Sequence, residues 1–175
     1  MLRDFNLLVT TTRGNEEEAC SEVWYLLGEI GDTAAKVDKT GVSGLIAVKT
    51  SLPPLEAIEK LRAILRERPY EFRYSLRMIP IQEVTRTGLN EIESIATKLS
   101  AEIRKNETFR ITVEKRFTNI SSKDVIKAAA MNIERKVDLT SPDKIVLIEI
   151  VGGLTGISIL KPSDIISTIK EKIES

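Results

Sequence analysis

Residues 109–150 read FRITVEKRFTNISSKDVIKAAAMNIERKVDLTSPDKIVLIEI, and this stretch decides the fold. At its start, Phe109, Ile111 and Val113 alternate with polar side chains, which predicts a strand with one buried face. At its end, residues 144–151 (KIVLIEIV) are apolar on both faces, which indicates a strand in the interior of a sheet. The stretch therefore begins and ends with strands.

A helix is expected between these two strands. Ser121 is followed by Asp124 three residues later, the pattern of a capping box, and we expect the helix to continue to about Val137. A strand, a crossover helix and a second strand make a parallel βαβ unit, which is expected to be right-handed. This half of the chain is therefore predicted to be of the α/β class.

Positive charge is concentrated in the same stretch, although the 175-residue chain has a formal net charge of zero. Residues 104–136 contain nine basic and four acidic side chains. A helix N-terminus with neighbouring lysines offers free N–H groups and positive potential to a phosphate. We therefore predict an anion-binding surface, and an ordinary solvated face is the alternative.

Composition restricts the chemistry of the chain. Histidine is absent, which removes the usual general base and the commonest zinc ligand, and Cys20 is the only cysteine. Neither a Gly-x-Gly-x-x-Gly turn nor a P-loop is present, so no cofactor, no metal and no catalytic residues are expected. A lone cysteine, the lack of a long apolar run and the lack of a signal peptide core favour a cytoplasmic protein without membrane contact.

The first 82 residues are predicted to form a domain of their own. The expected elements are a strand at 5–10, a helix at 15–30, strands at 33–40 and 45–50, a helix at 53–65 and a strand at 72–79. The order βαββαβ is that of a ferredoxin-like fold, an α+β arrangement with an antiparallel sheet.

Residues 83–175 are predicted to form the second domain, since Pro80-Ile81 and the polar segment Thr85–Gly88 indicate a boundary near residue 82. In addition to the stretch quoted above, we expect a helix at 92–103, a last strand at 156–160 and, after Pro162, an amphipathic C-terminal helix through Ile173.

Several short segments of this second domain, in this order, resemble the THUMP domain family. They are Lys115-Arg116, Ser122-Lys123-Asp124-Val125, Val137-Asp138-Leu139, Pro142-Asp143 and Val146–Ile150. Asp124 and Val125 stand where Glu and Ile are commoner in that family. In the first domain, the segments Thr10–Glu16, Leu26–Asp32 and Arg77–Ile81 look like parts of the THUMP-containing adaptors needed for acetylation of a cytidine in tRNA.

The resemblance implies a non-catalytic tRNA-binding adaptor. Such a protein would bind the acceptor stem and the 3′ end of tRNA and present the tRNA to a separate RNA acetyltransferase for N4-acetylcytidine formation. The alternatives are a detached RNA-binding subunit of a tRNA methyltransferase or thiolation enzyme, and a protein-interaction module. Because edge strands of either domain can pair, we expect a monomer or a weak homodimer.

Eight residues are candidates for RNA contact, and six of them surround the predicted helix start. The eight are Lys115, Arg116, Phe117, Ser122, Lys123, Lys127, Arg13 and Arg77. Phe117 is a candidate for stacking on an unpaired base, with packing under a loop as the alternative. For Arg13 the alternative is a strand-end cap, and for Arg77 an ordinary surface arginine.

Overall fold

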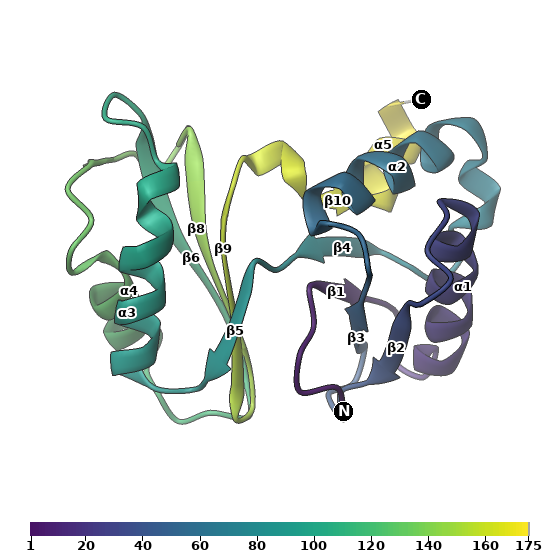
Figure 1. Cartoon of the computed structure of the whole chain (residues 1–175), viewed down its shortest axis with the longest axis horizontal. Helices are drawn as coiled ribbons and strands as arrows, with labels where there is room; N and C mark the ends of the chain where they lie inside the picture. The colour runs from purple at the N-terminus through teal and green to yellow at the C-terminus, as the bar shows by residue number, and fades with distance from the viewer. Residues whose placement is uncertain (175) are drawn as a thin grey trace. The chain divides into compact units, whose positions relative to one another are not determined.

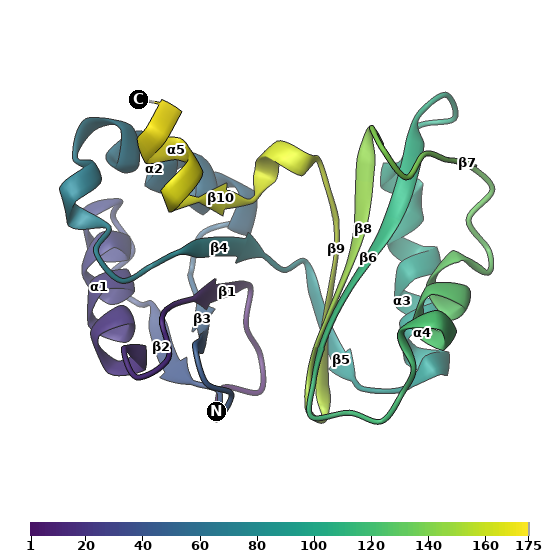
Figure 2. The same cartoon turned by 180° about the vertical axis from the view of Figure 1, so that it is seen from behind.

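The computed structural model describes residues 1–174 and divides into two compact units (Figures 1 and 2). The first unit comprises Met1–Ile81 together with the segment that starts at Asp164, and the second comprises Gln82–Ser163. Among residues 1–174, no helix has both the length and the hydropathy that crossing a membrane requires.

The first unit has the predicted order βαββαβ. Its elements are β1 (Leu7–Thr10), α1 (Glu16–Glu29), β2 (Lys36–Lys39), β3 (Leu45–Lys49), α2 (Pro54–Glu67), the 3-10 turn η1 (Pro69–Glu71) and β4 (Arg77–Pro80). The strands lie in the order β4-β1-β3-β2, and every pair is antiparallel. This arrangement confirms the ferredoxin-like interpretation.

The core of the first unit lies between one sheet face and the helices α1 and α2. Leu7 and Val9 of β1 pack with Val23 and Leu26 of α1 and with Leu61 of α2, and all five side chains are fully buried. The apolar residues of each helix recur every three or four positions, which places them on the one face that contacts the sheet.

The C-terminal segment differs from the prediction. It forms η3 (Pro162–Asp164), β10 (Ile166–Ser167) and α5 (Thr168–Glu174) instead of one continuous helix, and from Asp164 onward it belongs to the first unit instead of the second. The strand β10 pairs antiparallel with β4, and α5 packs on α2. The predicted continuous helix is wrong because the long-range pairing of β10 with β4 overrides the local helical periodicity.

Specific contacts hold this segment in the first unit. Ile166 is fully buried in the core of that unit. The Thr168 hydroxyl donates to the Ser75 carbonyl at 2.8 Å, and Arg62 Nε lies 2.7 Å from Glu171 Oε1. The last strand and helix therefore complete the sheet and the helical layer of the first unit.

The second unit is a five-stranded mixed sheet with two helices. Its elements are β5 (Glu83–Arg86), α3 (Leu89–Leu99), the 3-10 turn η2 (Ser100–Glu102), β6 (Thr108–Arg116), α4 (Ser122–Ala130), β7 (Lys136–Val137), β8 (Lys144–Val151) and β9 (Leu154–Leu160). The strand order is β5-β9-β8-β6-β7. β6 and β8 are parallel over eight residue pairs, so the predicted parallel βαβ unit is confirmed.

Both helices of this unit cover the same face of its sheet (Figures 1 and 2). Ile92 of α3 and Val125 and Ala129 of α4 pack against Val146 and Ile148 of β8. The strand β8 is buried from Ile145 to Val151, as its apolar composition predicts.

One predicted helix end in this unit is wrong. The helix expected to reach Val137 ends at Ala130, because Lys136 and Val137 form β7 at the sheet edge and pair with Thr108 and Phe109. The two units divide between Ile81 and Gln82, close to the boundary expected near residue 82. The polar segment Thr85–Gly88 starts within β5, where Thr85 pairs with Thr155 of β9.

Candidate nucleic-acid interface

The C-terminal end of β6 and the N-terminus of α4 place three exposed lysines on either side of one loop. Lys115 is the last residue but one of β6, and Lys123 is the second residue of α4. Lys127 lies four residues further along α4, on the same side of the helix as Lys123. No carboxylate pairs with any of these three ammonium groups within residues 1–174.

The N-terminus of α4 begins as the sequence predicts. Ser121 is the N-cap, with φ −70° and ψ 144°, and its hydroxyl accepts the Asp124 N–H at 3.1 Å. In the described part of the chain, the N–H groups of Ser122 and Lys123 have no hydrogen-bond acceptor. Because the helix dipole adds positive potential there, this end of α4 is suited to bind an anion.

Arg116 is engaged within the unit instead of being displayed beside Lys115. Its Nη1 lies 2.7 Å from Oε2 of Glu149, a side chain that is 0% exposed. A buried carboxylate requires a compensating positive charge, so the Arg116 guanidinium serves mainly to stabilise the folded unit. Sequence reasoning missed Glu149, although it is the only acid in the otherwise apolar strand after Lys144.

The loop between β6 and α4 exposes Phe117 and is braced on both sides. The ring is 76% exposed, so the alternative of packing under the loop is wrong. Lys115 Nζ donates to the Ile120 carbonyl at 3.1 Å, and the Ile120 N–H donates to Thr118 Oγ1 at 3.3 Å. On the other side, the Gly152 N–H donates to the Arg116 carbonyl at 2.8 Å.

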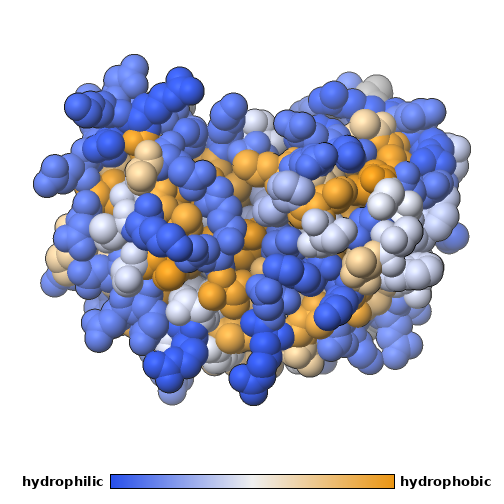
Figure 3. All heavy atoms as spheres, viewed as in Figure 1, coloured by the Kyte–Doolittle hydropathy of each residue, from blue (hydrophilic) through white to orange (hydrophobic). Residues whose placement is uncertain are grey.

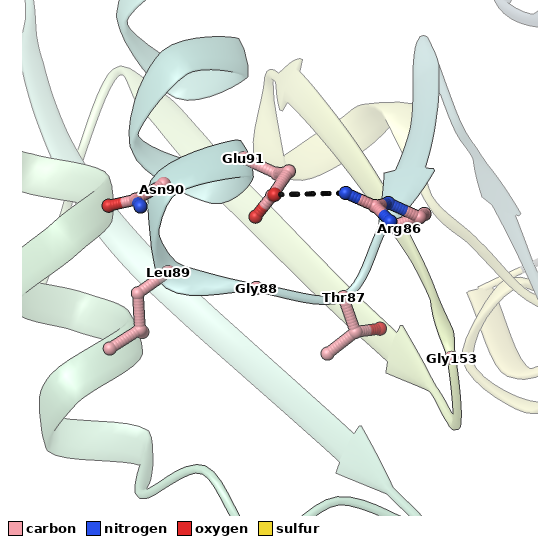
Figure 4. A pocket seen from close by; sticks show the side chains of 7 residues that line it. All are labelled: Arg86, Thr87, Gly88, Leu89, Asn90, Glu91 and Gly153. Atoms are coloured by element: carbon pink, nitrogen blue, oxygen red, sulfur yellow. Dashed lines mark ion pairs between the residues drawn. The ribbon is translucent and has the colours of Figure 1, made fainter.

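A second helix start lies at the same edge of the unit. A cavity of about 680 Å³ lies at the N-terminus of α3 and is lined by Arg86, Thr87, Gly88, Leu89, Asn90, Glu91 and Gly153 (Figure 4). The side chains of Arg86 and Glu91 point toward one another in this view, with 3.7 Å between Nη2 and Oε1.

The turn after β8 joins this cavity to the end of β6. The Thr87 hydroxyl donates to the Gly152 carbonyl at 2.8 Å, and the Thr87 N–H donates to Gly153 at 2.9 Å. The Gly152 N–H also donates to the Arg116 carbonyl, so the segments that lead into α3 and α4 both contact this turn. The two helices lie on the same side of the sheet (Figures 1 and 2). Around these helices, Figure 3 shows polar and charged side chains interspersed with apolar ones.

Much of the remaining positive charge in the quoted stretch is held at the other end of β6. Arg110 Nη1 donates to the Leu139 carbonyl at 3.0 Å, and Arg135 Nε donates to the Ile103 carbonyl at 3.0 Å. The local excess of cations predicted from the sequence is therefore divided, and Lys115, Lys123 and Lys127 are the members grouped at the start of α4.

Arg13 and Arg77 are exposed but belong to the first unit, whereas the other six candidates belong to the second. Arg13 precedes a glycine whose N–H donates to Glu16 Oε2 at 2.7 Å. Hydrogen bonds from its own backbone N–H and from those of Gly44 and Gly14 hold the pKa of Glu16 below its usual range. A carboxylate thus occupies the loop where a bound phosphate would lie.

Side chains suited to a metal ion do not gather in the part of the chain that the structure describes. No group of three or more Cys, Asp and Glu residues with metal-binding geometry is found among residues 1–174. The candidate groups for ligand contact in the second unit are the exposed lysines, the open N–H groups at the start of α4 and the exposed ring of Phe117.

Two sequence comparisons find similarity to known proteins. Residues 86–160 match the THUMP domain family. The chain is also similar to THUMP domain-containing protein 1 from Mus musculus, with 26% identity over 168 residues. This alignment covers 85% of the present chain and 48% of the mouse protein, so the chain spans about half the length of that relative.

Solved structures share the fold. PH1313 from Pyrococcus horikoshii superposes with a TM-score of 0.68 at 18% identity, covering 93% of this chain and 55% of that one. TrmN from Thermus thermophilus superposes with a TM-score of 0.56 at 14% identity, covering 87% and 44%. The residues 86–160 that match the THUMP domain family include β6, α4 and the exposed lysines, so the candidate surface lies within the matched part of the second unit.

Proposed function

We propose that this chain is a tRNA-binding adaptor that presents tRNA to a separate acetyltransferase for N4-acetylcytidine formation. The observation that carries the proposal is the grouping of Lys115, Lys123 and Lys127 around the open amides of α4, within the THUMP domain. Cations and helix-terminal amides are the groups that bind the phosphates of a nucleic acid.

The contacts would be made to the RNA backbone. A phosphate at the start of α4 accepts the N–H groups of Ser122 and Lys123, and the three ammonium groups neutralise the phosphates beside it. Arg116 acts indirectly, because its ion pair with Glu149 holds the end of β6 in place. Contacts of this kind position an RNA by its shape and leave the choice of base to other groups.

The adaptor role rests on the resemblance of the first unit and on composition. The segments Thr10–Glu16, Leu26–Asp32 and Arg77–Ile81 resemble the adaptors of tRNA acetylation, and the 175 residues contain no histidine. The partner would perform the acetyl transfer in the cytoplasm. The adaptor would bind the acceptor stem and 3′ end of the tRNA and so set the distance to the target cytidine.

Filter binding of tRNA with an intact and a 3′-truncated acceptor end tests the proposal. We expect the truncated tRNA to bind more weakly, and equal affinities would remove the role of the 3′ end. Mixing the acetyltransferase, tRNA and this chain should yield N4-acetylcytidine, and the triple variant Lys115→Glu, Lys123→Glu, Lys127→Glu should reduce the yield. Capture of a methyltransferase or a thiolation enzyme instead of the acetyltransferase would replace the proposed partner.

A further inference from the structure

Phe117 combines two properties that are individually unfavourable for a phenylalanine. Its ring is 76% exposed, more than any other aromatic side chain among residues 1–174. Its φ is +56°, and it is the only non-glycine residue with positive φ in the described chain. Glycine or asparagine adopts this left-handed conformation readily, whereas a bulky side chain there is a true outlier.

Neither folding nor solubility accounts for an aromatic residue at this position. Burial of the ring does not offset the backbone strain, because the ring lies in solvent. Strained residues persist where the surrounding structure holds them, and they are concentrated at sites that bind ligands. A ligand that covers the ring would supply the interaction that the free protein lacks.

The loop holds the ring in a defined place. Residue 116 on one side is fixed by the bond from Gly152 and by the ion pair with Glu149. On the other side, the bond from Lys115 Nζ to the Ile120 carbonyl closes the loop over residues 116–120. The ring therefore projects from a braced turn between Lys115 and the N-terminus of α4.

We propose that Phe117 stacks on an unpaired nucleobase and thereby selects RNA with a single-stranded extension over a blunt duplex. This inference rests on the proposed RNA binding. The exposed lysines hold phosphates on either side of the ring, and an aromatic face between phosphate contacts is the arrangement that binds single strands. Bases inside a duplex are stacked on both neighbours, and a ring on a short loop would meet only the outer face of the terminal pair, whereas each nucleotide of an unpaired extension can turn a face to it.

Two hairpin RNAs with equal numbers of phosphates separate the contribution of the Phe117 ring from that of the lysines that bind phosphates. One has a short 3′ single-stranded extension, and the other has the same nucleotides added as base pairs to its stem. The variant Phe117→Asn removes the ring and suits the left-handed backbone, so its melting temperature should be equal to or above that of the wild type. Phe117→Gly is a second ring-free variant with the same property.

The ring-free variants should bind the extended RNA about 5- to 150-fold more weakly and the blunt RNA as the wild type does. Phe117→Trp should retain the preference, and Ile126→Ala, an exposed apolar position on α4, should leave both affinities unchanged. An extension containing 2-aminopurine should lose fluorescence on binding to the wild type but much less with Phe117→Asn.

Three results would overturn the inference. Unchanged binding of the extended RNA by both ring-free variants would exclude stacking. An equal loss of affinity for both RNAs would show that the ring only maintains the structure of the loop. Loss of acetyltransferase capture without loss of RNA binding would make the ring a protein contact. If the wild type binds neither RNA, the proposed function itself fails, whereas salt-dependent binding of both RNAs without a contribution from the ring refutes stacking alone.

Discussion

Nη1 of Arg116 lies 2.7 Å from Oε2 of Glu149, whose side chain is 0% exposed. The two members of the pair Lys115-Arg116 therefore differ in what they do, although they are adjacent in the sequence. Lys115 is exposed and its ammonium group donates to the Ile120 carbonyl, whereas Arg116 compensates a buried charge 33 residues away. Their substitutions should separate stability from binding.

Arg116→Ala should lower the free energy of unfolding by about 3–5 kcal/mol, because it leaves the buried carboxylate without its guanidinium. Lys115→Ala is the matched control and should change it by no more than about 0.5 kcal/mol. Urea denaturation measures both. The double variant Arg116→Met, Glu149→Leu should recover most of the loss. Equal effects of the two alanine variants would show that the ion pair does not stabilise the fold.

Lys123→Ala and Lys127→Ala should each weaken tRNA binding and reduce the slope of log K against log salt. Each lost phosphate contact removes about 0.7 from the slope for single strands and about 0.9 for duplex. Lys98→Ala is the control, since Lys98 lies in the last turn of α3 and pairs with Glu83. Titrations at several salt concentrations give the slopes. If Lys98→Ala changed the slope as much as Lys123→Ala does, the RNA-binding surface would have to be sought away from the start of α4.

Ser121→Ala should lower the stability of the second unit by about 1 kcal/mol, because the Asp124 N–H loses its acceptor. Ser121→Asp should restore most of this loss, since aspartate is an equally good N-cap. Ser141→Ala, in an exposed turn, is the control. Denaturation followed by circular dichroism measures all three. No difference between the variants at 121 and 141 would mean that the cap contributes nothing to stability.

Asp32 should make the first unit sensitive to acid. Burial raises the pKa of this carboxyl, but hydrogen bonds from Ser51, Thr50 and the Ala34 N–H outweigh burial and leave the pKa below its usual value. A depressed pKa stabilises the folded state above the unfolded pKa of about 3.9, and the stabilisation is lost as the pH falls through the lower folded value.

Asp32→Asn should therefore lower the free energy of unfolding by about 1–3 kcal/mol at pH 7. The NH2 group of the new amide would face hydroxyl and N–H groups that donate to the carboxylate in the wild type. The stability of this variant should also fall less steeply than that of the wild type as the pH drops below about 4. Asp4→Asn, which removes only a surface partner of Lys49, is the control. Unfolding curves from pH 7 to pH 3 supply the comparison, and parallel pH profiles for wild type and Asp32→Asn would contradict the assignment.

Local signals predicted the elements that frame the candidate site. The alternation from Phe109 to Val113, the apolar run of β8 and the serine before Asp124 are each complete within a few residues, and the corresponding strands and helix start are present. The end of α4 was not predictable in the same way, because no glycine or proline marks Ala130. It depends instead on the pairing of β7 with β6.

The sequence by itself determined the ferredoxin-like order of the first unit, the parallel βαβ unit of the second and the start of α4, because periodicity and capping are short-range properties. Only the tertiary structure decided that Phe117 is exposed, that Arg116 serves Glu149, and that the last strand and helix complete the first unit. The roles of Arg116 and of the last strand and helix depend on partners 33 to 109 residues apart in the chain, and the local spacing of residues does not predict such contacts.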